Sequence, residues 1–396
     1  MLILSCNVGS TSFKYRLYDL SDQERELAQG QFEGVARPEG NSRHAAPGGF
    51  QQSSDVPADS YGAAIDESLN FLRASGALPE GRLPDAVAFK TVAALGYTGV
   101  QALTEEVLGA MEHLNTLLPA HNPPYVAAIR QFARMMPTVP LIGSFETGFF
   151  SDMQPAVYSY SLPAEYAQRG IRRNGAHGAS HEYVAGWVAQ REGKNDLRIV
   201  SCHLGGSSSM AAIVNGRGVD TTVGMSVQTG LPHNNRIGDI DPFLTFYFME
   251  TLGLSAERVK QLYTKESGLM GLSGGISADL RQIQQAADAG NAQARIAIDA
   301  FSYQIKKQIG AYAAAMDGLD VVAFTGGIGQ RSTSVRAGAL TGLDFLGIHL
   351  DAGRNLQPPE DGLISAPDSP VRVYTLATNE EIIIARKAKA FLMGSY

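Results

Sequence analysis

The chain has 396 residues, of which 44% are apolar and 18% charged, a composition typical of a globular protein of two or three domains rather than a disordered one. The net charge of −7 argues against a main role in coating nucleic acid or an anionic membrane. Two cysteines, Cys6 and Cys202, cannot form a disulfide framework or a CxxC metal site. No apolar run suits a signal peptide or a membrane span, so we expect a cytoplasmic enzyme.

Strands and helices are predicted to alternate along the chain, which favours an α/β fold. The first part should contain strands at 2–5 and 13–19, a surface excursion over 35–60, a helix at 61–75 and a strand at 86–90. Helices at 104–118 and 125–136 and a strand at 141–144 follow. The second part should contain a strand at 197–203, a hairpin of 209–214 and 218–222 around Asn215-Gly216, helices within 241–252 and 278–316, strands at 321–325 and 372–376, and a final helix at 380–393.

The chain contains an internal repeat. Ile3–Ser12 and Ile199–Ser208 are identical at five of ten positions, with an offset of 196 residues, about half the chain. Each copy is predicted to form a strand, a Gly/Ser turn and a second strand, with its cysteine as a small buried hydrophobe. Chance similarity between two buried hairpins is the alternative to duplication. We favour duplication, because both copies are rich in residues that bind phosphate.

Gly/Ser turns after strands are the main chemical signal, since no Walker A motif, helix-opening GxGxxG or HExxH is present. The three turns are Asn7–Lys14, His203–Ser208 and Thr325–Gly329. Backbone N–H groups and hydroxyls in such turns can donate to phosphoryl oxygens, and Lys14 adds positive charge. Three of them predict a cleft for a nucleotide or polyphosphate.

Two further segments concentrate charge. Arg172–His181 holds two arginines and two histidines in ten residues, and Asn234–Pro242 places Arg236 before a Gly-Asp turn. The first could be a solvated loop whose His181 caps a helix, and the second an ordinary helix start capped by Asp241. We favour a charge-stabilising loop at a phosphoryl centre for the first, because glycines closely flank His177.

Together these residues resemble the acetate kinase, or acetokinase, family over nearly the whole chain. Asn7–Lys14 matches the opening phosphate signature of that family, and Arg172–His181 matches its second signature. Further matches follow in the same order as in the family: His203-Leu204-Gly205, Arg236 with Gly238–Pro242, Ser267–Ser273, Gly327-Ile328-Gly329 and Thr378–Glu381.

The resemblance implies direct phosphoryl transfer from ATP to a short carboxylate, giving an acyl phosphate, mainly by positioning and charge stabilisation. It implies that Arg236 and His177 bind the phosphoryl group in flight, and that Asn7 and Glu380 hold Mg²⁺ (or Mn²⁺), partly through water. The implied phosphate and nucleotide contacts are Ser10, Ser12, Lys14, His203, Leu204, Gly205, Gly206, Ser207, Asp279, Leu280, Arg281, Gly327, Ile328 and Gly329.

Several positions depart from the family pattern. Lys90 stands where the family has an arginine, and so keeps the charge but loses the bidentate fork. Glu146 replaces the catalytic aspartate, Gly206 replaces an asparagine, and Gln330-Arg331 replaces Glu-Asn. These changes bear on the acyl substrate and the phosphoryl donor rather than on the fold.

The acyl pocket implied by the resemblance has lost bulk. The residues that would line it are Ala120, Ala176, Val92 and, by a weaker alignment, Val227. Lys90 and His121 would contact the carboxylate of the substrate. Alanines stand where the family has Leu and Phe, although Phe89, Phe149 or Tyr125 could fill the space. The polar run His233-Asn234-Asn235 offers donors and acceptors that a methyl group could not use. We therefore expect a carboxylate larger than acetate.

The repeat and the resemblance together predict two duplicated actin-like, sugar-kinase-like (ribonuclease H-like) α/β lobes with a cleft between them that closes on ligand. The N-terminal lobe should comprise 1–151 plus about 384–396, and the nucleotide-binding lobe 152–383. Members of the family are dimers, so a homodimer is expected, with a nucleotide and a carboxylate as ligands and without nucleic-acid or membrane partners.

Two other functions remain open from the sequence. One is a pyrophosphate- or polyphosphate-linked acyl kinase, because the changes at Gly206 and Arg331 could weaken contacts to adenine or ribose. The other is a degenerate nucleotide-binding regulatory protein. Retention of Asn7, His177, Arg236 and Glu380 speaks against the second, since a decayed site need not keep all four.

Overall fold

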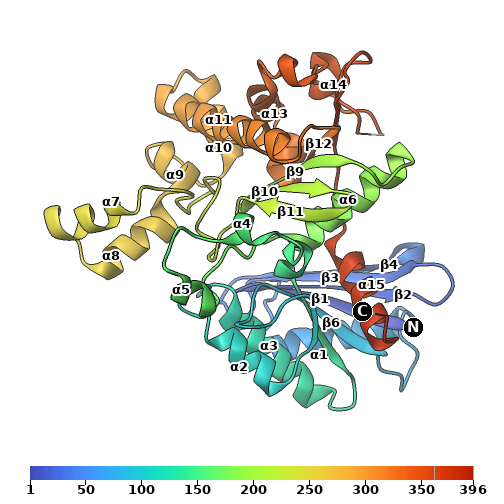
Figure 1. Ribbon diagram of the computed structural model, residues 1–396. Helices are drawn as coiled ribbons and strands as arrows, with labels where there is room; N and C mark the ends of the chain where they lie inside the picture. The colour runs from blue at the N-terminus through green and yellow to red at the C-terminus, as the bar shows by residue number, and fades with distance from the viewer. Residues whose placement is uncertain (361, 396) are drawn as a thin grey trace. The chain divides into compact units, whose positions relative to one another are not determined.

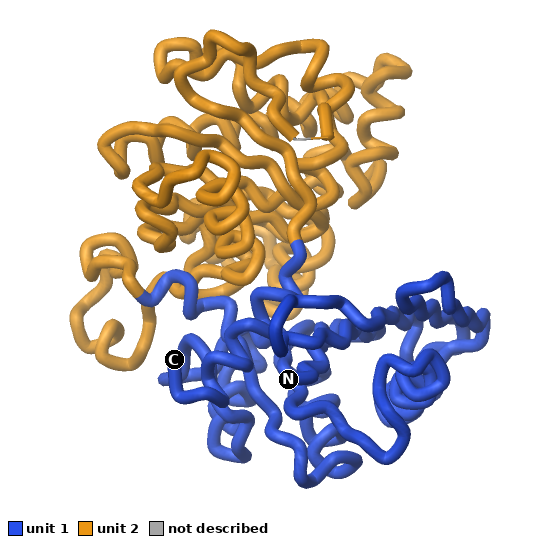
Figure 2. Tube along the Cα trace, turned by 90° about the vertical axis from the view of Figure 1, so that its right-hand side faces the viewer, with its two compact units in different colours: residues 1–151, 379–396 blue, residues 152–378 orange. Residues whose placement is uncertain are grey.

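The computed structural model describes residues 1–360 and 362–395 (Figure 1). The chain divides into two compact units (Figure 2). Unit 1 comprises Met1–Ser151 and Asn379–Tyr396, so that the C-terminal helix returns to the N-terminal unit, and unit 2 comprises Asp152–Thr378. Each unit is built around its own β-sheet with helices packed against it. No helix in the described ranges is both long and apolar enough to cross a membrane.

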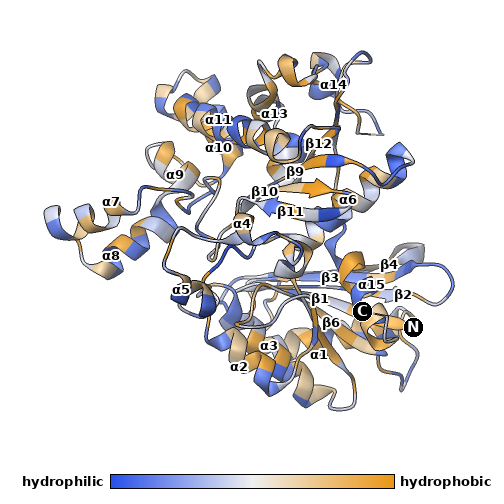
Figure 3. Ribbon diagram, viewed as in Figure 1, coloured by the Kyte–Doolittle hydropathy of each residue, from blue (hydrophilic) through white to orange (hydrophobic). Residues whose placement is uncertain are grey.

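The sheet of unit 1 has eight strands in the order β5-β4-β3-β2-β1-β6-β8-β7. The central strands are apolar, as their colours in Figure 3 show, because both faces of the sheet are covered. Helix α15 packs against β1 and β6, and α3 packs against β1 and β8. The strands are β1 Leu2–Val8, β2 Ser12–Asp19, β3 Arg25–Glu33, β4 Asn41–Ala46, β5 Phe50–Ser54, β6 Ala86–Thr91, β7 Val100–Ala102 and β8 Leu141–Phe145.

The surface excursion expected over 35–60 contains two strands that the sequence did not predict. Strands β4 and β5 lie there and extend the edge of the sheet. Their sequences show little apolar periodicity, so a local pattern could not reveal them. The buried ring of His44 on β4 is bonded to the Tyr15 hydroxyl at 2.8 Å and to the Glu67 carboxylate at 3.0 Å.

The helices of unit 1 are α1 Tyr61–Ala74, α2 Glu105–Glu112, α3 Asn122–Met135 and α15 Glu380–Leu392. Thr104 caps α2 as expected, but this helix ends six residues before the predicted Leu118. Helix α3 starts three residues earlier than predicted, because proline is tolerated in a first turn and the buried Asn122 amide donates to the carbonyls of Ala93 and Met111.

The sheet of unit 2 has five strands in the order β11-β10-β9-β12-β13. They are β9 Arg198–Leu204, β10 Ser208–Val214, β11 Arg217–Thr221, β12 Val321–Thr325 and β13 Arg372–Thr375. Asn215 and Gly216 both have positive φ (52° and 78°), as a two-residue hairpin turn requires.

The two sheets share one topology. Strands β3-β2-β1-β6-β8 of unit 1 follow the same order and the same pattern of antiparallel and parallel pairing as β11-β10-β9-β12-β13 of unit 2. Cys6 pairs with Phe89 across a parallel ladder, and Cys202 pairs with Phe324 in the same way. The repeated segments therefore hold equivalent places in two copies of one fold, which supports duplication over chance.

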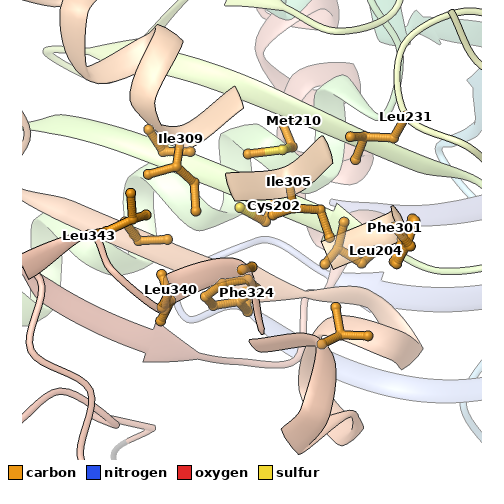
Figure 4. Close-up of a cluster of buried hydrophobic side chains, with 14 of the residues drawn as sticks. Cys202, Leu204, Met210, Leu231, Phe301, Ile305, Ile309, Phe324, Leu340 and Leu343 are labelled. Carbon is orange, nitrogen blue, oxygen red and sulfur yellow. The ribbon is translucent and has the colours of Figure 1, made fainter. Parts of the chain in front are cut away.

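The core of unit 2 lies between its sheet and helix α11 (Figure 4). Alternate residues of β9, among them Cys202 and Leu204, face α11, whereas Ser201 faces α6 on the other side. The predicted helix over 241–252 is a short α7 continued by a π-helical turn at Tyr247–Thr251. The helices are α4 Pro155–Tyr158, α5 Ala164–Gln168, α6 Gly178–Glu192, α7 Phe243–Phe246, α8 Ala256–Gln261, α9 Gly268–Leu272, α10 Leu280–Asp288, α11 Ala292–Ala315, α12 Gly326–Arg331, α13 Thr333–Leu340 and α14 Ala352–Leu356.

Candidate functional site

The turn between β1 and β2 carries the first predicted phosphate signature. The Gly9 N–H donates to the Ser12 carbonyl at 2.8 Å, and a Cβ on Gly9 would lie 2.4 Å from the Ser12 hydroxyl oxygen. Ser10 and Lys14 are exposed, and Asn7 lies directly opposite Lys14 in the ladder. Directly paired residues project from the same face, so this turn presents hydroxyls, an amide and a cation together.

A cluster of charged side chains lies beside this turn within unit 1. The Lys90 ammonium is 3.0 Å from a Glu146 carboxylate oxygen and 2.5 Å from a Glu380 oxygen. The Tyr125 hydroxyl donates to the Asn7 side-chain oxygen at 3.0 Å. Burial alone would lower the pKa of Lys90, but the two carboxylates raise it well above the ordinary lysine value. Lys90 is therefore a fixed cation that neutralises half of the negative charge of its two partners.

The oxygen donors of this cluster suit a hard divalent cation. Glu380 and Asn7 offer a carboxylate and an amide oxygen, the ligand types that Mg²⁺ takes in proteins. The described ranges contain no group of three or more His, Cys, Asp or Glu side chains placed to hold a metal. A divalent ion held here would therefore take most of its ligands from water and phosphate oxygens, as Mg²⁺ commonly does.

The residues expected to contact the acyl group are distributed over both units. In unit 1, Val92 is buried, Ala120 is exposed and His121 is half-buried at the N-cap of α3. In unit 2, Ala176 and Val227 are buried.

Unit 2 contains a cavity of about 800 Å³ at the turns that follow β9 and β12. Seven of the residues expected to contact a nucleotide line it: Gly205, Gly206, Asp279, Leu280, Arg281, Gly327 and Ile328. His203, Leu204, Ser207 and Gly329 belong to the same turns but are not part of its lining. The lining also includes residues that were not among the expected nucleotide contacts, namely Asn234, which was expected at the acyl substrate, and Ala278, Gln284, Arg331, Ser332, Thr333 and Ser334. Arg331 had been noted as a departure from the family near the nucleotide site, whereas the only sequence signal for Ser332, Thr333 and Ser334 was their place directly after the third glycine turn.

The parallel pairing of β9 and β12 brings the two glycine turns together. Gly326 has a φ of 73°, and a Cβ there would lie 2.5 Å from the Leu204 carbonyl oxygen, so only glycine allows this approach. Beneath the turn, the buried Arg336 guanidinium donates to the carbonyls of Gly329 and Gln330 at 2.9 and 2.7 Å. Burial lowers the pKa of Arg336 to about 10, which still leaves it charged at neutral pH under the cavity wall.

The second signature places two histidines in one hydrogen-bonded network, and a third, His203 of β9, stacks against it. His177 occupies a left-handed backbone conformation (φ 55°) at the start of α6, and its ring stacks on that of His203 with centroids 4.2 Å apart. The Ser209 hydroxyl lies 2.7 Å from His177 Nδ1 and 2.8 Å from His181 Nε2. Burial, with a smaller effect of His203, lowers the pKa of His181 well below the ordinary value, so His181 is neutral. It lies inside α6 and does not cap the helix.

Arg236 is a largely buried cation on the loop after β11. It donates to the Val227 carbonyl at 2.7 Å, and no carboxylate pairs with it in the part of the chain that the structure describes. Burial lowers the pKa of Arg236 to about 10. A buried guanidinium without an acidic partner is costly unless it meets an anion, so this side chain is poised for one.

The buried ring of His233 holds this loop against the turn after β9. His233 is 1% exposed, and its Nδ1 accepts the Ser208 N–H at 2.9 Å. Burial, and then Arg236, lower the pKa of His233 to about 3, so the ring stays neutral. From the sequence we expected His233 to contact the substrate. In the structure its Nδ1 instead accepts a hydrogen bond from the Ser208 backbone within unit 2.

Replacement of Lys90 by methionine should destabilise the protein. It would leave two neighbouring carboxylates without their shared cation, and loss of one partner of a buried ion pair costs about 3–5 kcal/mol. Because the pKa of Lys90 is raised on folding, its contribution is complete below the unfolded lysine pKa and is lost as pH rises through the higher folded value. Urea unfolding should therefore show the deficit at pH 7, with Lys90→Arg as the charge-keeping control. Equal stability of Lys90→Met and the unmodified protein at pH 7 would contradict this account.

Comparison with known proteins gives one consistent answer. Residues 2–386 match the acetokinase family. The chain is 39% identical over 395 residues to an acetate kinase of Staphylococcus carnosus, covering 98% of both chains. Its structure is similar to that of Porphyromonas gingivalis acetate kinase (TM-score 0.86, 34% identity, 99% of both chains) and of a propionate kinase from Francisella tularensis (TM-score 0.89, 29% identity, 98% of both chains). The comparisons support neither the pyrophosphate-linked nor the regulatory alternative. The chain belongs to the acetokinase family, with its duplicated actin-like α/β fold, and is an ATP-dependent kinase that phosphorylates a carboxylate.

Proposed function

We propose that this kinase transfers the γ-phosphoryl group of ATP to a short carboxylate larger than acetate, giving an acyl phosphate and ADP in the cytoplasm. The observation that carries the proposal is the buried Arg236 guanidinium, which has no carboxylate partner within the described ranges and shares a loop with a residue that lines the 800 Å³ cavity. The names of two similar proteins, an acetate kinase and a propionate kinase, support considering more than one acyl length.

The chemistry needs cations more than it needs a base. A carboxylate substrate is already ionised at neutral pH, so its oxygen attacks the γ-phosphorus directly while the bond from that phosphorus to the bridging oxygen of ADP breaks. Two anions must therefore be brought together, and charge neutralisation is the main task of the protein. We assign Arg236 and His177 to the equatorial oxygens of the phosphoryl group, and Lys90 with His121 to the carboxylate.

The remaining residues position these groups. Glu146 holds the Lys90 ammonium at 3.0 Å, and we assign it the role of orienting that cation. Ser10, Ser12 and Lys14 contact phosphate oxygens, and the glycine turns of unit 2 hold the nucleotide. Asn7 and Glu380 would hold Mg²⁺ or Mn²⁺, which when bound neutralises phosphate charge.

Truncation of Arg236 should affect turnover more than binding. Arg236→Ala is expected to lower kcat by roughly 10²-fold or more, the cost of losing a donor aimed at transferring charge. Arg236→Lys should recover part of this loss, since it restores the charge without the planar fork. Steady-state kinetics with ATP and a saturating carboxylate measure both variants. An unchanged kcat with only a raised KM would remove Arg236 from this role.

The acyl preference is expected to favour added bulk. Alanine stands at 120 and at 176 where the family has leucine and phenylalanine, and each additional CH₂ that a larger substrate buries contributes about 0.8 kcal/mol, or several-fold in kcat/KM. We expect kcat/KM to rise from acetate through propionate and butyrate or their hydroxylated and branched analogues. Ala176→Phe should shift the preference back toward acetate with little change in KM for ATP. A wide margin in favour of acetate that Ala176→Phe leaves unaltered would refute the proposed pocket.

A homodimer is proposed from an apolar patch on α7 and the π-helical turn after it. Phe243, Phe246, Tyr247 and Leu252 are 74%, 51%, 50% and 54% exposed. Figure 1 shows α7 and α8 extending away from the sheet of unit 2. Clustered exposed aromatic side chains of this kind mark association sites, and a second copy brings an equally apolar patch to a two-fold interface.

Light scattering should therefore give the mass of a dimer. The double variant Phe243→Glu/Phe246→Glu should shift it to a monomer, because charge would be buried at the contact. Phe345→Glu serves as the control, since Phe345 is 79% exposed elsewhere in unit 2 and should leave the dimer intact. A monomeric unmodified protein, or a dimer that survives the double substitution, would exclude this interface.

A further inference from the structure

One side-chain donor in the wall of the cavity is left without a partner. Asn234 has four polar groups, and three of them are engaged within unit 2. Its N–H donates to the Gly206 carbonyl at 3.2 Å, its carbonyl accepts from the Met270 N–H at 2.8 Å, and its side-chain oxygen accepts from the Asn235 N–H at 3.0 Å. Only the side-chain NH₂ group has no partner among the described residues, and Asn234 lines the cavity.

The orientation of this amide follows from the same contacts. A backbone N–H can be accepted only by the oxygen of an asparagine side chain, so the bond from Asn235 fixes which end of the amide is which. The NH₂ group must therefore occupy the opposite position. The donor is oriented before any ligand arrives, which lowers the entropic cost of using it.

The backbone that carries Asn234 is held rigidly. Gly268 (φ 62°) packs so closely against this loop that a Cβ there would lie 2.2 Å from the His233 carbonyl oxygen. The N–H groups of Leu269 and Ser267 donate to the carbonyls of His233 and Asn235 at 2.8 and 3.3 Å. Helix α9 and the residue before it thus fix the loop on both sides of Asn234.

The position of Asn234 identifies the part of the ligand that it faces. It lies two residues before Arg236, which is assigned to the phosphoryl group, and beside the glycine turn after β9. Its amide nitrogen lies 3.4 Å from where a Cβ of Gly206 would be, and Gly206 does not have a left-handed φ. Glycine at 206 is therefore not required by backbone conformation. Its effect is to leave the Asn234 amide uncovered toward the cavity.

We infer that the Asn234 side-chain NH₂ group is a binding donor for a phosphate oxygen of the nucleotide. The inference rests on the proposed function, because it takes the cavity as the nucleotide site. It adds a contact that joins the wall of the cavity to the loop of Arg236, so that the same rigid loop holds both the bound nucleotide and the group in transfer.

The test is nucleotide binding by calorimetry without any carboxylate substrate. Asn234→Asp keeps the oxygen that accepts from Asn235 and replaces the donor with a negative oxygen. Loss of a hydrogen bond to a charged group should weaken ADP and ATP binding by about tenfold to a hundredfold. Asn235→Asp is the matched control, because it adds the same charge one residue away and should stay within about threefold of the unmodified protein. Asn234→Ala removes the donor without adding charge and should show a smaller loss.

The outcomes distinguish failure of the proposed function from failure of the Asn234 contact alone. Failure of the unmodified protein to bind ADP or ATP would overturn the proposed function, and the inference with it. Normal binding by the unmodified protein with equal affinities for Asn234→Asp and Asn235→Asp would overturn the inference alone. Binding of adenosine, measured alongside, should be equal in the unmodified protein and Asn234→Asp. A loss for adenosine as large as that for ADP would place the amide at the base or ribose and contradict the phosphate contact.

Discussion

The repulsion between two anions is the constraint on which the rest of this structure depends. A carboxylate and a triphosphate approach each other closely only where nearby positive charge offsets their mutual repulsion. In this protein such charge is held in buried or half-buried positions, where solvent screens it least. Arg236 and Arg336 are both buried without an acidic partner in the described ranges, and Lys90 is held between two carboxylates. A buried arginine without an acidic partner is unfavourable for stability taken alone, which is the expected signature of a group that serves a ligand.

Duplication of one α/β unit provides the scaffold for these charges. In both sheets the turn after the first repeated strand is rich in glycine and serine, and in unit 2 the turn after the parallel neighbour β12 approaches the end of β9 too closely for a Cβ at Gly326. The two copies have diverged in the polar groups that surround the shared sheet. Unit 1 adds a lysine–carboxylate cluster, whereas unit 2 adds a nucleotide-sized cavity and a histidine–serine network. Each unit therefore carries a different set of polar and charged groups.

The sequence predicted most of the buried strands, the long helices and half of the cavity lining, because these depend on local periodicity and on glycine turns. It missed β4 and β5, and no local pattern encodes the Tyr15–His44–Glu67 contact that ties β4 to β2 and α1. It singled out His233 and Asn234 as one polar run, but could not separate the ring that supports Ser208 from the amide that faces the cavity. It also could not show that Lys90 and Glu380, 290 residues apart, form an ion pair. Such side-chain partners are set by tertiary packing rather than by spacing along the chain.

The central claim is transfer of a phosphoryl group from ATP to a carboxylate oxygen. Phosphorus NMR of the protein with ATP, Mg²⁺ and propionate observes this transfer directly. The account predicts an acyl phosphate resonance that grows in step with ADP while inorganic phosphate stays at background. Release of inorganic phosphate without an acyl phosphate, or unchanged ATP across acetate, propionate and butyrate, would contradict it.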